Sequence, residues 1–271
     1  EVWKSCPNIK NIDLLIKNSE IINSRPFVKL KYILRYKNGS NKLQDKIDIK
    51  LIKNYLKQKQ YTKINKSWWN EITAIHLKTK NFYKINELKH GKLTLRDPEI
   101  KELGNIKNKK ILHLQCHLGL DSLSLALKGA NVTGVDISEQ AICFAQQLNR
   151  DMNLNVKFIC SDIYDLPIIL RDKFDIVFCS YGILFWLNNL EVWGKIISHY
   201  LKKKGFIYLV DFHPIANVVD CDHKNNVMFN QDYFSNNNKP KLWKKERDYA
   251  NPNYISKNQI YTWQWTIGEL I

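Results

Sequence analysis

From residue 109 onward, short apolar runs alternate with helical patterns, and this alternation limits the chain to one fold class. Five runs have the length and residue types of buried strands: 111–114, 131–136, 156–160, 174–180 and 206–211. Helical patterns separate several of them, over 121–128, 139–149 and 189–203, with Ser138 as an N-cap of the second. Strands that alternate with helices at this spacing predict an α/β fold, a doubly wound and mostly parallel sheet with helices on both faces.

The first part of the chain has a different pattern and carries the charge. Residues 1–110 hold 26 Lys and Arg against 10 Asp and Glu, which accounts for the whole net charge of +16. Residues 43–58 have the spacing of an amphipathic helix with a basic face, whereas residues 27–36 alternate like a strand but also suit a helix. We therefore predict a basic, mainly helical N-terminal extension over 1–66 and a second domain over 67–271.

Composition excludes several classes of protein. No apolar stretch is long enough to cross a membrane, and the N-terminus lacks the features of a signal peptide. The six cysteines, which never form a C-x-x-C pair, indicate reduced, buried thiols in a cytoplasmic protein and no metal site. Only 6 of the 42 basic residues are Arg, so the charge fits biased composition better than phosphate recognition.

Polar or acidic residues follow each of the five predicted strands. A turn over 115–119 follows the first strand, Asp136 ends the second, Asp162 follows the third, and Ser180-Tyr181 and Asp211-Phe212-His213 follow the fourth and fifth. Ligands of such sheets bind at the carboxyl ends of the strands. Because an ionised carboxylate accepts two hydrogen bonds side by side, Asp136 is suited to the two hydroxyls of a ribose. The pattern predicts a nucleoside-binding site.

At these residues the chain resembles the class I S-adenosylmethionine-dependent methyltransferases, from about Trp68 to its end. The match is strongest over residues 111–124, which read Ile-Leu-His-Leu-Gln-Cys-His-Leu-Gly-Leu-Asp-Ser-Leu-Ser, and it continues through 132–138, 174–178 and 201–205. The form L-Q-C-H-x-G-x-D is similar to a bacterial branch of that family. His113 stands where the common motif has an acid, and of its three glycines only Gly119 remains, with Gln115 and His117 at the other two positions.

This resemblance implies a Rossmann-like fold and S-adenosylmethionine as the cofactor. It also implies a set of cofactor-binding residues: Gln115, His117, Gly119, Asp136, Ile137, Asp162, Ile163 and Ser180. A dinucleotide-binding turn would need G-x-G-x-x-G to seat a diphosphate, and the bulky side chains at 115, 117 and 118 argue against it. Asp136 would contact the ribose, and Asp162 with Ile163 the adenine.

Methyl transfer needs alignment of donor and acceptor, and it needs a base only if the acceptor must lose a proton. The sequence offers Tyr181, Asp211 and His213 as catalytic candidates at the strand ends, although His213 also suits a strand cap. His76 and Tyr83 belong to an aromatic segment that could close over the cofactor. His113 and His117 are better explained as structural residues of the turn, and Trp68, Trp69 and Phe82 as packing residues.

Three functions compete at this point. The first is methyl transfer to a small-molecule acceptor. The second is RNA methylation with the basic N-terminal segment as a docking arm. One observation argues against it: methyltransferases that act on base amines have an N-P-P-Y-type sequence after the fourth strand, and this chain has Ser180-Tyr181-Gly182-Ile183 there. The third is a non-catalytic remnant, because residues 216–271 do not supply the two further strands that complete such a sheet. We expect a fragment whose C-terminal strands are missing; the sequence leaves the acceptor and the oligomeric state open.

Overall fold

The computed structural model describes residues 19–22, 25–79, 82–221, 226–229, 232–234 and 239–271. The chain divides into two compact units, Glu1–Thr62 and Lys63–Ile271, and each is described separately. None of the helices in the described ranges combines the length and apolarity that crossing a bilayer requires. Cys6 lies outside the described residues.

The described part of the first unit holds a short hairpin followed by helices. Its elements are β1 (Glu20–Ile22) paired antiparallel with β2 (Arg25–Phe27), α2 (Leu30–Lys37), and the first turns of α3 (Leu43–His76). The alternating stretch 27–36 is therefore mostly helix, ended by Asn38 and Gly39. Lys37 forms ion pairs with Asp45 and Asp48, at 2.5 and 2.6 Å, which join α2 to the start of α3.

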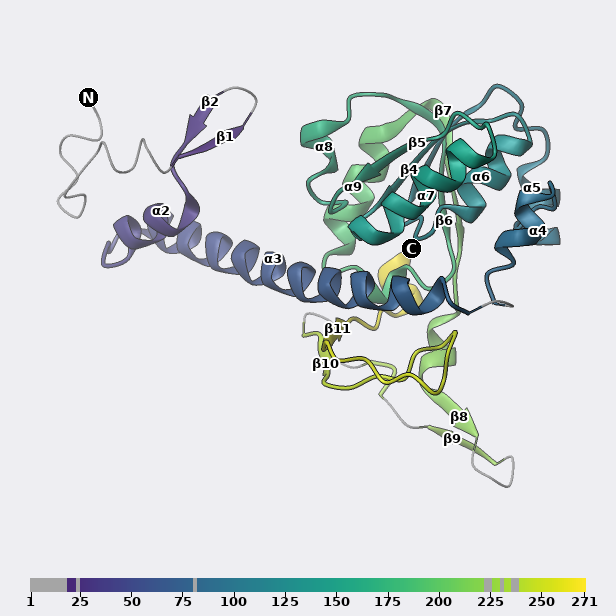
Figure 1. Ribbon diagram of the computed structural model, residues 1–271. Coiled ribbons are helices and arrows are strands. Elements are labelled where there is room, and N and C mark those ends of the chain that lie inside the picture. The colour runs from purple at the N-terminus through teal and green to yellow at the C-terminus, as the bar shows by residue number, and fades with distance from the viewer. Residues whose placement is uncertain (1–18, 23–24, 80–81, 222–225, 230–231, 235–238) are drawn as a thin grey trace. The chain divides into compact units, whose positions relative to one another are not determined.

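The second unit is built around a five-stranded sheet whose described strands are all parallel (Figure 1). In spatial order the strands are β5 (Lys157–Cys160), β4 (Asn131–Asp136), β3 (Lys110–Leu114), β6 (Phe174–Ser180) and β7 (Leu201–Val210). The chain adds β4 and β5 on one side of β3, and then β6 and β7 on the other. This reversal of direction is the Rossmann-like, doubly wound topology that the sequence predicts.

Helices cover both faces of this sheet. They are α4 (Ile85–Lys89), α5 (Asp97–Leu103), α6 (Leu120–Leu127) and α7 (Glu139–Asp151), which pack with Ile111 and Phe178, and α8 (Leu166–Ile169) and α9 (Leu190–Tyr200), which pack with Leu112 and Val177. Successive strand residues thus feed two separate cores, as the two-residue period of a strand requires. Ser138 caps α7 as predicted, and its hydroxyl accepts a hydrogen bond from the amide of Ala141 at 3.1 Å.

Two sequence expectations about this unit were wrong. The helix predicted over 189–203 ends at Tyr200, because Leu201 already pairs with Phe174 across the sheet and a bulge follows before Ile176 pairs with Phe206. The cysteines are not uniformly buried. Cys116 and Cys179 are buried free thiols, whereas the free thiols of Cys143 and Cys160 are exposed.

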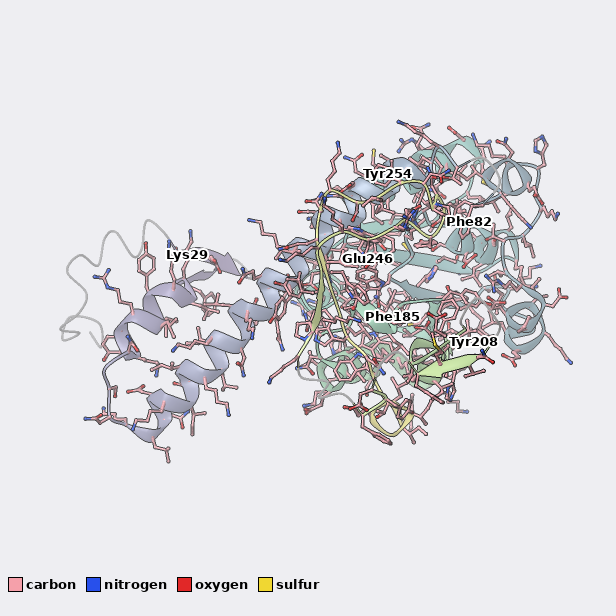
Figure 2. All side chains as sticks on the ribbon, turned by 90° about the horizontal axis from the view of Figure 1, so that it is seen from below. Lys29, Phe82, Phe185, Tyr208, Glu246 and Tyr254 are labelled. Atoms are coloured by element: carbon pink, nitrogen blue, oxygen red, sulfur yellow. The ribbon has the colours of Figure 1, made fainter. Side chains whose placement is uncertain are left out.

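The C-terminal segment consists of short elements and packs against the last turns of α3. The elements are the 3-10 helix η2 (Pro214–Asn217), the hairpin β8 (Val219–Cys221) and β9 (Val227–Phe229), the pair β10 (Lys241–Trp243) and β11 (Ile260–Thr262), and α10 (Ile267–Leu270). The 3-10 helix η1 (Leu184–Trp186) lies earlier in the chain, between β6 and α9. Glu71 of α3 accepts hydrogen bonds from the Tyr254 hydroxyl at 2.7 Å and from the amides of Lys257 and Asn258. Figure 1 shows β10 and β11 on the same side of the sheet as these turns, and Figure 2 labels Tyr254 and Glu246 of the segment.

Candidate functional site

The loop after β3 keeps the backbone of a glycine loop although two of its three glycine positions hold other residues. Gln115, His117 and Gly119 all have positive φ, of 55°, 47° and 71°. The left-handed conformation costs a residue with a Cβ atom roughly 1–2 kcal/mol. Such strain persists only where the surroundings fix it, and it concentrates at functional sites. The loop shape is therefore retained at an energetic cost at Gln115 and His117.

Contacts made by these two side chains fix the loop. The Gln115 amide nitrogen donates a hydrogen bond to the carbonyl of Ile183 at 3.1 Å, which ties the loop to the segment after β6. The Oε1 atom of Gln115 is buried and has no hydrogen-bond partner within the described residues, and the same holds for Nδ1 of His117. Buried polar atoms without partners are rare in proteins. Two of them in one loop point to a ligand with hydrogen-bonding groups.

Asp136 lies at the end of β4 and is held by the neighbouring loops. Its carboxylate accepts hydrogen bonds from the amide of His117 at 2.8 Å and from the amide of Ser138, also at 2.8 Å. The residue is only 7% exposed, and burial raises its pKa to about 6, an effect that the backbone hydrogen bonds partly offset. Each oxygen retains a free lone pair, so the carboxylate can still accept from a ligand.

The predicted adenine contacts lie beside Asp136. The amide of Ser161 donates to the carbonyl of Asp136 at 2.9 Å, which joins the loop after β5 to the end of β4. In this loop the Asp162 carboxylate accepts from the amide of Tyr164 at 3.0 Å, and Ile163 is buried. Ile137 is half-buried at the end of the adjacent strand. The structure thus brings Asp136, Ile137, Asp162 and Ile163 to one edge of the sheet.

The predicted catalytic residues occupy the other side of β3, and their surroundings differ. The Asp211 carboxylate accepts four backbone hydrogen bonds, from the amides of Gly182, Ile183, Leu184 and Phe212, at 2.5 to 3.0 Å. His213 is exposed, and its Nδ1 atom accepts from the amide of Ile215 as the N-cap of η2. These contacts are those of residues that shape turns. A catalytic role for Asp211 and His213 stays a prediction.

Tyr181 and Ser180 border a cluster of charged side chains formed by Arg96, Glu99 and Asp121. Tyr181 has a φ of 47°, and the guanidinium of Arg96 lies 4.0 Å from the centre of its ring. Burial, and then the neighbouring Glu99, raise the pKa of Tyr181 to about 12. The Ser180 hydroxyl lies 3.4 Å from a carboxylate oxygen of Asp121, whose pKa is raised chiefly by burial. Sequence reasoning missed Glu99, which is fully buried in α5 although it carries an ionisable group.

A cluster of titratable and aromatic side chains meets at His117 from parts of the chain far apart in sequence. His76, at the end of α3, lies with Nδ1 2.8 Å from His117 Nε2 and with Nε2 2.7 Å from the Asp248 carboxylate. The Tyr83 hydroxyl lies 2.8 Å from His76 Nδ1 and 2.7 Å from the Tyr249 hydroxyl. The sequence indicated His76 and Tyr83, but nothing marked Asp248 and Tyr249 in a segment without regular periodicity.

Three tryptophans lie beside this cluster. The Trp69 and His117 ring centres are 5.1 Å apart, Trp186 lies 5.0 Å from Trp69, and Trp68 stacks on Trp186 at 5.3 Å. A separate shallow hollow, open to solvent, lies at the ends of β6 and β7. It is lined by Leu184, Phe185 (labelled in Figure 2), Asp211, Phe212, Pro214, Trp263 and Trp265. Aromatic side chains therefore line the carboxyl edge on both sides of the loop.

His113 is a buried neutral histidine beneath the loop, and it should make the protein sensitive to acid. Its Nδ1 lies 2.8 Å from the Ser122 hydroxyl, its ring meets the Phe178 ring edge-on at 4.9 Å, and burial lowers its pKa from 6.5 to about 3. Between pH 3 and 6.5 the unfolded chain therefore binds the proton and the folded chain does not. Lowering the pH from 7 to 5 should cost about 2 kcal/mol of unfolding free energy through this residue alone.

This expectation is checked by urea unfolding of the wild type and a His113→Asn variant at both pH values. Groups other than His113 titrate in both proteins, so the difference between their pH dependences isolates the histidine. We expect the wild type to lose about 2 kcal/mol more than the variant. Parallel pH dependences would contradict the assignment of a buried neutral ring.

Comparison with known proteins finds a similarity to methyltransferases. Residues 111–205 match the family model of a methyltransferase domain. The ubiquinone biosynthesis O-methyltransferase of Coxiella burnetii is 33% identical over 122 residues, which are 44% of this chain and 46% of that protein. The enzyme of the same name from Chromobacterium violaceum is 26% identical over 149 residues, 55% of this chain and 59% of that protein. The chain thus spans about half the length of these relatives.

Among solved structures, an S-adenosylmethionine-dependent methyltransferase from Mesorhizobium loti superimposes with a TM-score of 0.47 and 17% identity, over 64% of this chain and 75% of that one. The family model covers the four strand ends and loops, after β3, β4, β5 and β6, at which the predicted cofactor residues lie. Residues 111–205 are thus the part of the chain that is similar to a methyltransferase domain.

Proposed function

We propose that this chain binds S-adenosylmethionine at the carboxyl edge of its sheet and transfers the methyl group to a small-molecule acceptor. The observation that carries the proposal is the loop after β3, which keeps three residues with positive φ although two of them are strained. The matching methyltransferase domain supports it. The named relatives are O-methyltransferases, so transfer to oxygen is the reaction we propose for this chain as well.

The polar groups of the site suit this cofactor. The unpartnered Oε1 atom of Gln115 is a hydrogen-bond acceptor, and the Asp136 carboxylate, once ionised, is an acceptor as well. Neither group can donate a hydrogen bond to a ligand. S-adenosylmethionine offers matching donors, the two ribose hydroxyls and an ammonium group, and it carries no phosphate that the Gln115 and His117 side chains would crowd. When bound, it supplies a methyl group already activated on a sulfonium.

We assign the parts of the site as follows. Asp136 would hold the ribose hydroxyls, with Ile137 beside it, and Asp162 with Ile163 would hold the adenine. Gln115, His117, Gly119 and Ser180 would surround the methionine part. Tyr181, which Arg96 fixes, would help to orient the acceptor, and the turn that Asp211 shapes would form its wall. The carboxyl edge carries aromatic side chains, with Trp69 beside His117 and with Phe185 and Trp263 at the turn, and these suit a flat, small acceptor better than a nucleic acid backbone.

Calorimetric titration with S-adenosylmethionine and with S-adenosylhomocysteine tests the proposal. Replacing Asp136 with alanine removes two charge-assisted hydrogen bonds to the ribose, so we expect the affinity to fall by about 100-fold or more. The matched control is Asp172→Ala, which removes an exposed carboxylate from the loop before β6 and should leave the affinity unchanged. If the wild type gives no heat with either compound, the proposal is wrong.

A further inference from the structure

Three ionisable side chains lie in line at the edge of the proposed cofactor site. His76 is placed between Asp248, 2.7 Å from its Nε2, and His117, 2.8 Å from its Nδ1. The side chains of His76 and Asp248 are both fully buried. Asp248 and His76 have no part in the cofactor contacts proposed above. Burying an acid and a histidine together is costly unless they interact closely, so this arrangement needs an explanation.

The hydrogen-bond partners determine where the protons lie. An ionised Asp248 only accepts, so His76 carries its proton on Nε2 and presents a lone pair at Nδ1. His117 Nε2 and the Tyr83 hydroxyl both lie 2.8 Å from that nitrogen, and its one lone pair accepts from one of them. We assign His117 as the donor, with the Tyr83 hydroxyl donating instead to Tyr249. Burial lowers the pKa of His117 well below 6.5, so its ring is neutral. Its Nδ1 is consequently a lone pair, and it is the atom without a partner.

We propose that Asp248, His76 and His117 form a proton relay in which His117 Nδ1 takes the proton of an O–H acceptor during methyl transfer. This inference rests on the proposed function and narrows its acceptor to one that must lose a proton. The ring centres of Trp69 and Tyr83 lie 5.1 and 5.5 Å from that of His117, so a flat acceptor with a phenolic hydroxyl suits the surroundings. Acceptors without a proton to lose would not need the relay.

The step balances in protons and electrons. The acceptor O–H bond breaks and its proton moves to His117 Nδ1, while the oxygen keeps the electron pair and forms the new bond to the methyl carbon. The bond from that carbon to sulfur breaks with its electron pair on sulfur. His117 passes its Nε2 proton to His76 Nδ1, so the positive charge ends on His76 beside the Asp248 carboxylate. Asp248 and His76 are thus positioning residues, and His117 is the residue that contacts the acceptor.

The substitution Asp248→Asn separates the relay from the fold. Oδ1 of Asp248 accepts hydrogen bonds from the amides of Ala250 and Asn251, at 3.1 and 2.7 Å, and an asparagine oxygen can keep both. The asparagine NH₂ group then faces His76 Nε2, which forces the His76 proton to Nδ1. His117 must in turn accept at Nε2 and carry its proton on Nδ1, where it cannot act as a base. The variant therefore reverses the direction of the relay without removing it.

The first measurement is long-range ¹H–¹⁵N NMR of the full chain with ¹⁵N-labelled histidine and bound S-adenosylhomocysteine at pH 7.5. We expect His76 and His117 to be neutral and protonated at Nε2 in the wild type, and both to be protonated at Nδ1 in Asp248→Asn. A wild-type His117 with its proton on Nδ1 overturns the relay. Calorimetry should give the same affinity for S-adenosylhomocysteine in the variant as in the wild type, which shows that the cofactor site is intact. A wild-type protein that does not bind S-adenosylhomocysteine would instead overturn the proposed function.

The second measurement is transfer of radiolabelled methyl groups to catechol, phenol and 4-hydroxybenzoate. Asp248→Asn should lower kcat by about 100-fold and change KM by less than about threefold, since the proton is taken only in the transition state. The control Asp172→Asn should match the wild type. A wild type that binds the cofactor but methylates none of the three phenols overturns the relay, as does an unchanged kcat in the variant, or a loss of cofactor affinity equal to the loss of kcat.

Discussion

Replacing Gly119 with alanine is expected to lower the free energy of unfolding by about 3 kcal/mol. A Cβ atom at this position would lie 2.6 Å from Cε1 of Phe158 and 2.9 Å from Cβ of Ala145, inside the core between α7 and the sheet. Overpacking of this kind costs about 1–3 kcal/mol, because a buried ring cannot move without disturbing its neighbours. The φ of 71° adds roughly 1–2 kcal/mol for a residue with a side chain.

Urea unfolding followed by circular dichroism measures this loss, and Gly194→Ala is its matched control. Gly194 lies in α9, and a Cβ atom there would meet nothing within 4 Å. Alanine should therefore stabilise the helix by about 0.5–1 kcal/mol, so the same substitution acts in opposite directions at the two positions. If both variants shifted stability in the same direction, the contact of Gly119 with Phe158 would not be as described.

Removing the carboxylate of Asp211 should have an effect of similar size, about 3 kcal/mol, for a different reason. The carboxylate accepts hydrogen bonds from the three consecutive amides of residues 182–184 and from the amide of Phe212. The substitution Asp211→Ala leaves all four amides without this partner. Hydrogen bonds to a charged group contribute about 1.5–3 kcal/mol each when buried, but the residue is half-buried and water replaces part of the loss. The turn at 182–184 should loosen together with Leu184 and the hollow that it lines.

The experiment distinguishes a structural Asp211 from a catalytic one. A carboxylate that shapes the turn is needed for the free energy of unfolding, which can be measured without any substrate. A carboxylate that acted only as a base would leave that free energy within about 0.5 kcal/mol of the wild type, as we expect for the exposed control Asp172→Ala. Equal stability of the two variants would favour the catalytic role.

The parts of the fold that the sequence predicts are those in which the signal is local. The five strands of the sheet follow from short apolar runs, and the start of α7 follows from Ser138 and the amide three residues later. The end of α9 does not, because Leu201 leaves the helix to pair with Phe174 in a neighbouring strand. The helical pattern of apolar residues continues past Tyr200 in the sequence, but pairing with Phe174 makes the residues from Leu201 onward a strand.

The same distinction explains the candidate site. Asp136 and Asp162 were predicted because each directly follows a strand, and parallel strands bring their ends to one edge. Asp248 could not be predicted as a site residue, because its partner His76 is 172 residues away in the sequence and the segment around Asp248 shows no helical or strand periodicity. The basic N-terminal extension over 1–66 likewise stays a prediction, although the chain divides at Thr62 into two compact units.

The strained backbone at Gln115 and His117 has a consequence for the order of the loop. A glycine loop adopts its shape because its residues tolerate it. Here the shape depends on what the two side chains hold, the carbonyl of Ile183 for one and His76 for the other. Local opening of the segments that carry Ile183, His76 or Asp248 would remove these restraints. Hydrogen exchange of the 115–117 amides should therefore follow the opening of those distant segments, while the sheet beneath stays closed.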